Sequence, residues 1–128
     1  MKKVEAIIRE EKLHDVMQSL EEKGFIALTV TTVSGRGQQK GLLLEWRVGE
    51  YRIDLLPKIK IEIVVRDQDA QPVVDIISKS AKTGEIGDGM IFVTSVEHMM
   101  RIRTGEMDIL APIKVAPFKE KSNQYPTK

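Results

Sequence analysis

The sequence of 128 residues contains no cysteine and only two histidines, His14 and His98. Without cysteine there can be no disulfide framework, no thiolate metal site and no thiol nucleophile. Two histidines also make a histidine-rich metal site implausible. No apolar run is long enough to span a bilayer, and the N-terminus has no signal-peptide pattern. We therefore expect a cytoplasmic protein, whose membrane contact, if any, is made through a partner.

The chain also has no strong charge of one sign. The chain has 20 Lys and Arg residues and 19 Asp and Glu residues, which gives a formal net charge of +1. This balance provides no general field that would attract nucleic acid or an anionic membrane. A nucleic-acid-binding module would also need a basic face and exposed aromatic side chains on its strands, where this chain carries Ile and Val. The length fits one domain with a real core.

Two strand–helix units, residues 4–25 and 60–84, resemble each other in outline. In the first unit, residues 4–8 are apolar and β-branched, which indicates a buried strand. Residues 10–23 then follow a helical period, with apolar side chains at Leu13, Val16, Met17 and Leu20. Gly24 is predicted to end this helix in a left-handed conformation. Residues 25–33 are rich in Thr and Val and predict a second strand.

The second unit begins with the strongest strand of the chain, residues 58–65. Its Ile59, Ile61 and Ile63 fall on one face, and Lys58, Lys60 and Glu62 fall on the other. Asp67 or Asp69 is predicted to cap a second helix, which Gly84 ends. The apolar positions of that helix are Val73, Val74, Ile77 and Ala81. Residues 90–93 and 99–103 predict two further short strands.

This order of elements predicts a ferredoxin-like α+β domain, a double βαβ sandwich with two helices on one face of an antiparallel sheet. The other face of the sheet needs a cover, and oligomerisation is a common one. We place this domain at residues 1–108. Residues 109–128 contain several prolines and lysines without a clear period, and we expect an extended arm or a loose tail.

One long segment, residues 34–57, interrupts the duplicated pattern. Ordering a connection of this length costs backbone entropy, so small domains seldom carry one without a function. Trp46, Arg47 and Tyr51 lie between its glycines. They either pack back on the body or form an exposed anchor with the composition of an interface hot spot.

Two motifs are candidates for anion binding. The sequence Thr-Gly-Glu-Ile-Gly-Asp-Gly at 83–89 is either a helix end with a tight turn or a glycine-rich loop whose N–H groups bind phosphate. Alternation places Arg101 and Arg103 on one face of the last predicted strand, where they are either a solvated edge or an anion clamp. Lys40, Lys58, Glu62 and Arg9 are charged positions that, taken alone, are most often plain surface.

The order and spacing of these motifs resemble the PII nitrogen-regulatory signal-transduction family. The resemblance covers residues 1–108 and rests on Gln39–Gly41, Gly49–Tyr51 through Asp54–Lys58, residues 61–65, the 83–89 motif, residues 91–93 and Arg-Ile-Arg-Thr-Gly-Glu at 101–106. It implies a non-enzymatic homotrimer of ferredoxin-like subunits with ATP or ADP in the clefts between them. It also implies Mg²⁺ and 2-oxoglutarate as further ligands, and a signalling T-loop at about residues 37–55 (an order–disorder switch).

The resemblance also assigns residues to these ligands. The nucleotide would be bound by residues of two neighbouring subunits: Thr29, Gly35, Gln38, Glu62, Val64, Gly87, Asp88, Gly89, Met90, Arg101 and Arg103. 2-Oxoglutarate would be bound at the base of the T-loop by Arg9, Gly37, Gln39, Lys40, Gly41 and Lys58, and Gln39 would help to hold the magnesium. Trp46 and Arg47 would contact the partner, an ammonium transporter or a nitrogen-assimilation enzyme, and Tyr51 would be a modification site.

The chain departs from the family pattern at two ligand positions. Met90 stands where the family usually has Lys, which removes one ammonium group from the phosphates, and Gln38 stands where Arg is usual. An alternative is therefore a PII-like nucleotide-binding regulator with a different effector. Lys58, Gln39 and Arg9 argue against that alternative. An enzyme is disfavoured, because no nucleophile stands beside a partnered base.

Overall fold

The computed structural model describes the backbone of residues 1–37, 42–46, 49–53 and 55–110. Side chains are described for the same residues except 42–46 and 49–53. The chain forms strand β1, a short 3₁₀ helix η1, helix α1 and strand β2, which span Lys2–Ile8, Glu10–Lys12, Leu13–Glu22 and Thr29–Gly35. Strands β3 and β4 follow at Leu42–Trp46 and Gly49–Ile53. Strand β5, helix α2 and strand β6 span Leu56–Val65, Asp67–Ala81 and Gly89–Ser95.

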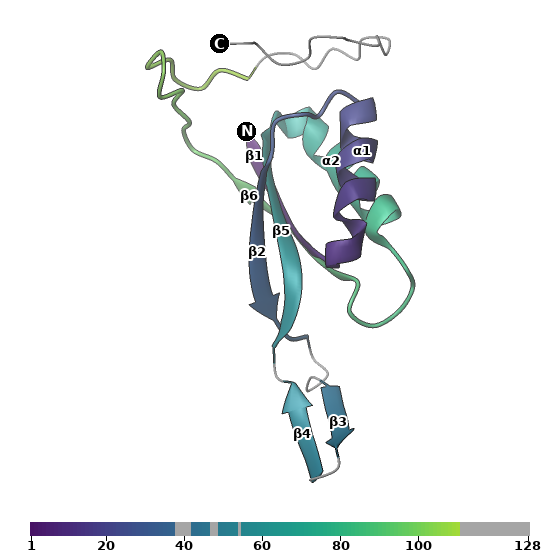
Figure 1. Ribbon diagram of the computed structural model, residues 1–128. Helices are drawn as coiled ribbons and strands as arrows, with labels where there is room; N and C mark the ends of the chain where they lie inside the picture. Colours follow the sequence, from purple (N-terminus) through teal and green to yellow (C-terminus); the bar gives the residue numbers. More distant parts are fainter. Residues whose placement is uncertain (38–41, 47–48, 54, 111–128) are drawn as a thin grey trace, which may run out of the picture.

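Four of the strands form one antiparallel sheet in the order β2-β5-β1-β6, and both helices cover the same face of it (Figure 1). The repeated β-α-β units therefore form the ferredoxin-like α+β fold that the order of motifs predicts. Alternate residues of β1 and β5 point to the helices, because side chains of a strand alternate between its faces. Ile59, Ile61 and Ile63 are 6%, 0% and 3% exposed, as their spacing predicts.

The helices complete the core with one apolar stripe each. Val16 and Leu20 of α1 and Val73 and Ile77 of α2 are fully buried, whereas Met17 is 40% exposed. Residues 10–12 form a 3₁₀ turn instead of the first turn of the predicted helix. Gly24 ends α1 with φ +88°, as predicted. The second helix begins at Asp67 with Arg66 at its N-cap, so the predicted side-chain cap by Asp67 or Asp69 is wrong.

The carboxylates of α2 have other partners. Asp69 accepts a hydrogen bond from Arg66 at 2.8 Å, and Asp67 accepts one from the α-amino group of Met1 at 2.8 Å. That ammonium group lowers the pKa of Asp67. Both carboxylates still lie in the first turn, where they complement the helix dipole.

The sheet face opposite the helices carries charged side chains. Lys3 contacts Glu62 at 3.3 Å, and Lys60 contacts Glu5 at 3.8 Å and Glu62 at 3.7 Å. These four side chains remain between 28% and 37% exposed, so the described chain covers this face only in part. The pairs follow from the strand register, which sets Glu5 opposite Glu62 and Ile7 opposite Lys60.

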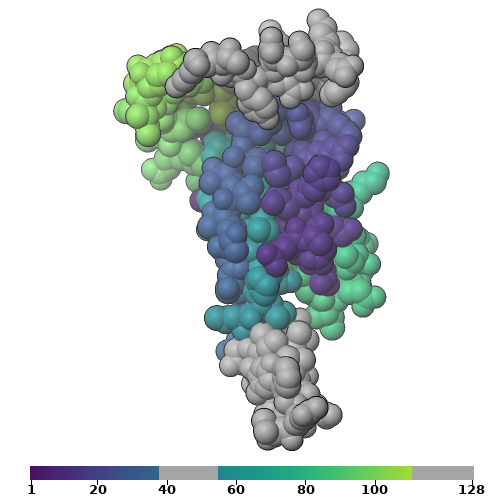
Figure 2. All heavy atoms as spheres, viewed as in Figure 1, coloured from purple at the N-terminus to yellow at the C-terminus, as the bar shows by residue number. Residues whose placement is uncertain are grey.

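The long segment between β2 and β5 contains a hairpin that the sequence did not predict. Strands β3 and β4 pair with each other, with Leu42 opposite Ile53 and Trp46 opposite Gly49, as a separate two-stranded sheet. Figure 1 shows this hairpin beyond the ends of β2 and β5. In the space-filling view the helices and the sheet strands form one continuous body (Figure 2). The long segment of residues 34–57 thus contains β3 and β4, and its last two residues begin β5.

Candidate functional site

The candidate site lies at the end of the sheet from which the long segment departs. Ile8, the last residue of β1, pairs with Ile59 of β5 on one side and Gly89 of β6 on the other. Arg9 follows Ile8, Lys58 precedes Ile59, and residues 83–89 join α2 to β6. The fold therefore brings Arg9, Lys58 and the 83–89 loop to the same end of the sheet, although they come from three separate parts of the chain.

Asp88 organises the 83–89 loop by accepting hydrogen bonds from four donors. Its Oδ2 accepts the backbone N–H groups of Thr83 at 2.9 Å and Gly84 at 2.8 Å. Its Oδ1 accepts the Thr83 hydroxyl and, at 3.1 Å, Nε of Arg9. The pKa of Asp88 is held well below its usual range. The hydrogen bond from the Thr83 hydroxyl has the largest effect, and the two N–H groups and Arg9 add to it. Asp88 is therefore an ionised residue that folds the loop from inside.

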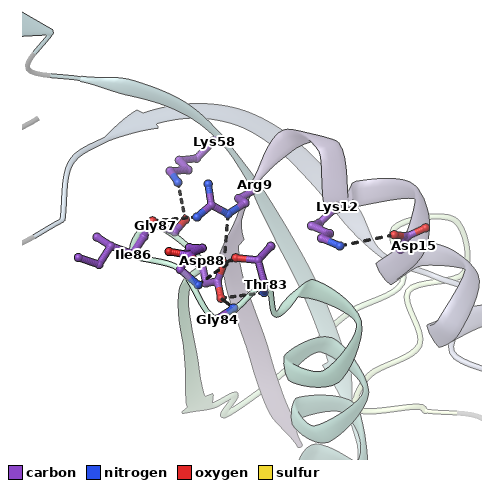
Figure 3. Close-up of polar contacts among 10 residues, drawn as sticks. Arg9, Lys12, Asp15, Lys58, Thr83, Gly84, Ile86, Gly87 and Asp88 are labelled. Atoms are coloured by element: carbon purple, nitrogen blue, oxygen red, sulfur yellow. Dashed lines mark hydrogen bonds and ion pairs between the residues drawn. The ribbon is translucent and has the colours of Figure 1, made fainter. Parts of the chain in front are cut away.

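Two basic side chains hold the outer part of the same loop (Figure 3). Nη2 of Arg9 donates to the carbonyl of Ile86 at 2.8 Å, and Nζ of Lys58 donates to the carbonyl of Gly87 at 2.6 Å. The Arg9 and Lys58 side chains thus converge on adjacent peptide units. Arg9 contacts both the carboxylate that folds the loop and a carbonyl on its rim. We call the group Arg9, Lys58, Thr83 and Asp88, with the loop they hold, the clasp.

All three glycines of the loop, Gly84, Gly87 and Gly89, have conformations that other residues rarely adopt. Gly87 has φ +101° and Gly89 has φ +110°. A Cβ atom on Gly87 would lie 3.3 Å from Nη2 of Arg9, and one on Gly89 would lie 1.7 Å from the carbonyl oxygen of Ile7. Gly89 is therefore required where the loop backbone meets β1, and Gly87 lets the Arg9 guanidinium lie close to the loop.

The electrostatics of the clasp favour an anion. The clasp contains two cationic side chains and one carboxylate, and both oxygens of that carboxylate already accept hydrogen bonds from within the clasp. Consecutive backbone groups around glycines with positive φ form concave anion sites in many proteins. Guanidinium and ammonium groups are also the usual partners of phosphates and carboxylates. The donor set therefore fits a phosphate or carboxylate ligand, although the Lys58 and Arg9 contacts seen here are to the loop itself.

The other predicted residues of the sheet lie on the open face. Thr29 pairs with Glu62 across β2 and β5, and Val64 pairs with Lys3 across β5 and β1. Gly35 ends β2 opposite Leu56. Met90 pairs with Ile7, and its side chain is 63% exposed beside the clasp. These residues form a surface that leads from the 83–89 loop across the sheet, which is compatible with one extended ligand.

Arg101 and Arg103 lie far from the clasp within one chain. Strand β6 runs from Gly89, opposite Ile8, to Ser95, opposite Lys2. At about 3.3 Å per residue this separates the two ends of β6 by about 20 Å. The arginines follow the far end, in a segment that Figure 1 shows leaving the body there.

The predicted strand at residues 99–103 is also wrong. Met100 makes a single bridge to Met107, and residues 102–104 form a turn closed by the Gly105 N–H donating to the Arg101 carbonyl at 2.8 Å. Gly105 has φ +73°, which permits this turn. The arginines therefore lie around the tip of a small hairpin, and strand alternation does not place them on one face.

Several predicted ligand and partner residues cannot be compared with the structure. Gln38, Gln39, Lys40, Gly41 and Arg47 lie outside the described residues. Gly37 is exposed just after β2. Trp46 ends β3 and Tyr51 lies in β4 opposite Leu44, but only their backbone is described.

Two features are absent from the described part of the chain. Within it, no three His, Asp or Glu side chains come together as a metal ligand group. None of its helices has the length and apolar character needed to cross a membrane.

Thr83 is the clasp residue that the sequence analysis did not single out. Its hydroxyl donates to Asp88 and accepts the Glu85 N–H at 3.1 Å. The available signal was a Thr and an Asp five positions apart on either side of a glycine turn, because both residue types readily bond to nearby backbone.

The fold and the clasp together define a ferredoxin-like α+β protein with a loop suited to binding an anionic ligand. Comparison with known proteins then gives the family. The family model described as "Nitrogen regulatory protein P-II" matches residues 1–106. This chain is 57% identical over 106 residues to "Nitrogen regulatory protein P-II 2" of Methanothermobacter thermautotrophicus, which covers 83% of this chain and 92% of that protein.

Two bacterial relatives are similar at the same level. The chain is 53% identical over 108 residues to "Nitrogen regulatory protein P-II" of Klebsiella oxytoca, covering 84% of this chain and 96% of that protein. It is 50% identical over 106 residues to the protein of that name from Rhizobium meliloti, covering 83% of this chain and 95% of that protein. The chain therefore belongs to the nitrogen regulatory protein P-II family, which confirms the resemblance drawn from the motifs.

Proposed function

We propose that this protein is a trimeric cytoplasmic sensor of ATP or ADP and 2-oxoglutarate, and that it regulates an ammonium transporter or a nitrogen-assimilation enzyme through residues 37–55. It acts as a binding switch and catalyses no reaction. Mg²⁺ joins ATP and 2-oxoglutarate at the base of the T-loop, where Gln39 helps to hold it. Membrane association is made through the transporter.

The observation that carries this proposal is the clasp. Arg9 and Lys58 converge on the carbonyls of Ile86 and Gly87, next to a glycine loop. The long segment departs from the same end of the sheet, because Gly35 at the end of β2 pairs with Leu56 at the start of β5. An anion bound at the clasp would therefore lie beside the base of the signalling segment, which is the arrangement that a ligand-controlled loop requires.

The separation of the arginines supports an assembly with shared sites. Arg101 and Arg103 follow one end of β6 and the clasp lies at the other end, so one chain does not bring them together. A second copy can supply them, as the family resemblance implies. The partly exposed ion pairs of the open sheet face, with Phe92 at 46% exposed, give that copy a surface on which to pack.

The decisive experiment is titration calorimetry of ATP with Mg²⁺, followed by 2-oxoglutarate in the presence of saturating ATP and then of ADP. We expect ATP to bind, and 2-oxoglutarate to bind only in the presence of Mg²⁺ and ATP. Light scattering on the same samples measures the trimer. Absence of ATP binding would refute the proposal.

A matched pair of variants locates the sites. Lys58→Met removes the cation that bonds Gly87, and we expect it to abolish 2-oxoglutarate binding. Lys79→Met removes an exposed cation from the last turn of α2 and should leave binding unchanged. Equal loss in both variants would show a general charge effect.

The partner contact is tested separately. Trp46→Ala together with Arg47→Ala should abolish co-purification with the transporter while nucleotide binding persists.

The alternative is a PII-like nucleotide-binding regulator with a different effector. Met90 favours it, because a thioether stands where an ammonium would otherwise reach the phosphates, and its side chain is 63% exposed at the start of β6. In this case ATP or ADP would bind in the same titrations and 2-oxoglutarate would not bind with either nucleotide.

A further inference from the structure

The two arginines that follow β6 lie on a small hairpin, residues 98–108, which has little apolar burial to hold it. Met100 is 59% exposed, Ile102 is 96% exposed and Met107 is 45% exposed. A segment without buried side chains keeps one conformation only if hydrogen bonds or ion pairs hold it, because ordering each residue costs backbone entropy. The polar contacts of this hairpin therefore determine where Arg101 and Arg103 are presented.

Asp108 provides most of the contacts at the base of the hairpin. Its Oδ1 accepts the Met99 N–H at 2.9 Å, and its own N–H donates to the Met99 carbonyl at 2.8 Å. Its Oδ2 lies 3.2 Å from Nδ1 of His98. The backbone of Asp108 has φ +57°, a left-handed conformation that Asp and Asn tolerate better than most residues. The side chain and the backbone of one residue thus close the base.

The tip has a second set of contacts that depends on this base. The Arg101 N–H donates to the Glu106 carbonyl at 2.9 Å, and Nη1 of Arg101 lies 3.7 Å from the Glu106 carboxylate. The Met100–Met107 bridge lies between the two sets. If the Asp108 carboxylate releases Met99 and His98, the base keeps, among its described contacts, only the backbone bond from the Asp108 N–H to the Met99 carbonyl, and the register at the tip is held less firmly.

We propose that Asp108, with His98, is a positioning residue that fixes the 98–108 hairpin so that Arg101 and Arg103 are presented together to the nucleotide on a neighbouring copy. This inference rests on the proposed nucleotide binding. Asp108 itself does not touch the ligand. Its contribution is to order the hairpin before binding, so that less entropy is lost when the arginines meet the phosphates.

The contact with His98 makes this positioning dependent on pH. A protonated imidazole beside the carboxylate forms an ion pair, and a neutral one keeps at most a hydrogen bond. The hydrogen bond from the Met99 N–H lowers the pKa of Asp108 most, and His98 lowers it further. The Asp108 carboxylate is therefore ionised at both pH 6 and pH 8. Other charged groups near the pair, among the described residues, are the α-ammonium of Met1, which Asp67 binds, and the Arg101–Glu106 pair.

The test compares ATP affinity in the presence of Mg²⁺ at about pH 6 and about pH 8, because an imidazole is protonated to a greater extent at the lower pH. We expect Asp108→Asn and Asp108→Gly to bind ATP about three- to tenfold more weakly than the wild type. Both variants permit the left-handed backbone. Asp108→Gly removes both acceptor oxygens and adds backbone freedom, whereas Asp108→Asn keeps one neutral oxygen in place of the carboxylate, so the two together report what the carboxylate contributes. Asp75→Asn, on the exposed face of α2, is the charge-matched control and should bind like the wild type.

The pH profile separates positioning from a purely structural role. The ratio of wild-type affinity to His98→Gln affinity should be about two- to fivefold larger at pH 6 than at pH 8, which is the range for an exposed ion pair. Titration of ATP and of the α-amino group cancels in this ratio, because both are present in each protein. Wild-type affinity in Asp108→Asn, or a ratio that does not change with pH, would overturn the proposal.

Amide hydrogen exchange distinguishes this inference from the proposed function. If the wild type does not bind ATP, the nucleotide proposal fails, and the hairpin is then judged on the exchange of the Met99 and Arg101 N–H groups. Loss of their protection in Asp108→Asn, with protection of β1 unchanged, supports the positioning role of Asp108. Unchanged protection of Met99 and Arg101 overturns it.

Discussion

Gly89→Ala provides the sharpest test of how the 83–89 loop is joined to the sheet. Gly89 has φ +110°, and a Cβ atom would lie 1.7 Å from the Ile7 carbonyl oxygen. Ordinary contact needs more than 3 Å, so β1 and β6 would have to separate by well over an ångström at this end. The neighbouring atom is backbone and cannot rotate away, so the strain cannot be relieved by one side chain.

The expected loss of stability has two parts. The positive φ costs a residue with a side chain about 1–2 kcal/mol. Breaking about two ladder hydrogen bonds where β6 begins adds about 0.5–1.5 kcal/mol each. We therefore expect Gly89→Ala to lower the free energy of unfolding by about 2–5 kcal/mol. Gly84→Ala is the matched control, because Gly84 has φ +90° but no atom within 4 Å of its Cβ position. It should lose only the first part, about 1–2 kcal/mol.

Urea unfolding followed by circular dichroism measures both variants, at one fixed subunit concentration because assembly contributes to apparent stability. The same glycine-to-alanine change acts on the unfolded chain in both cases and cancels in the comparison. Equal losses in the two variants would refute the reasoning, because they would show that the approach of the loop to Ile7 adds nothing to the cost of the backbone conformation.

Three further predictions concern the clasp. Arg9→Lys can keep only one of the two contacts of Arg9, to Asp88 or to Ile86, and should weaken ATP binding about tenfold in calorimetry; unchanged affinity would contradict a role of Arg9 in holding the loop. Asp88 has a lowered pKa, so its carboxylate adds stability that is present above about pH 4 and is lost as the pH falls further. The urea midpoint of the wild type should therefore fall more steeply between about pH 4 and pH 2 than that of Asp88→Asn, and parallel curves would exclude this linkage. Met90→Lys should tighten ATP binding by about tenfold without changing trimer stability, since the side chain is already 63% exposed; unchanged affinity would mean that another group already compensates for the absent ammonium.

Much of the fold follows from residue periodicity alone. The alternation of Ile with Lys and Glu in β5 predicts both the strand and its buried face, because a strand half-covered by helices must alternate. The left-handed end of α1 follows from Gly24, since few other residues adopt that conformation. These signals are local, so the sequence displays them directly.

Predictions from periodicity were wrong where the contact that determines the structure involves residues outside the repeating segment. Arg101–Arg103 alternate like a strand, but Gly105 and Asp108 close a turn through contacts to Arg101 and Met99. Asp67 and Asp69 look like helix caps, but each has a partner, the N-terminus or Arg66, outside the usual capping pattern. The clasp could not be predicted from periodicity, because Arg9 meets Asp88 across 79 positions of sequence.

The number of N–H donors that Arg9 and Lys58 keep beyond their loop contacts determines whether a ligand must break those contacts. An arginine has five N–H donors and a lysine ammonium has three. With described residues, Arg9 uses two of its donors, on Asp88 and Ile86, and Lys58 uses one, on Gly87. Three donors of Arg9 and two of Lys58 are thus left by the loop contacts. The anion that we propose as the ligand could therefore contact the two side chains while they continue to hold the loop, and its binding would not require the loop contacts to break.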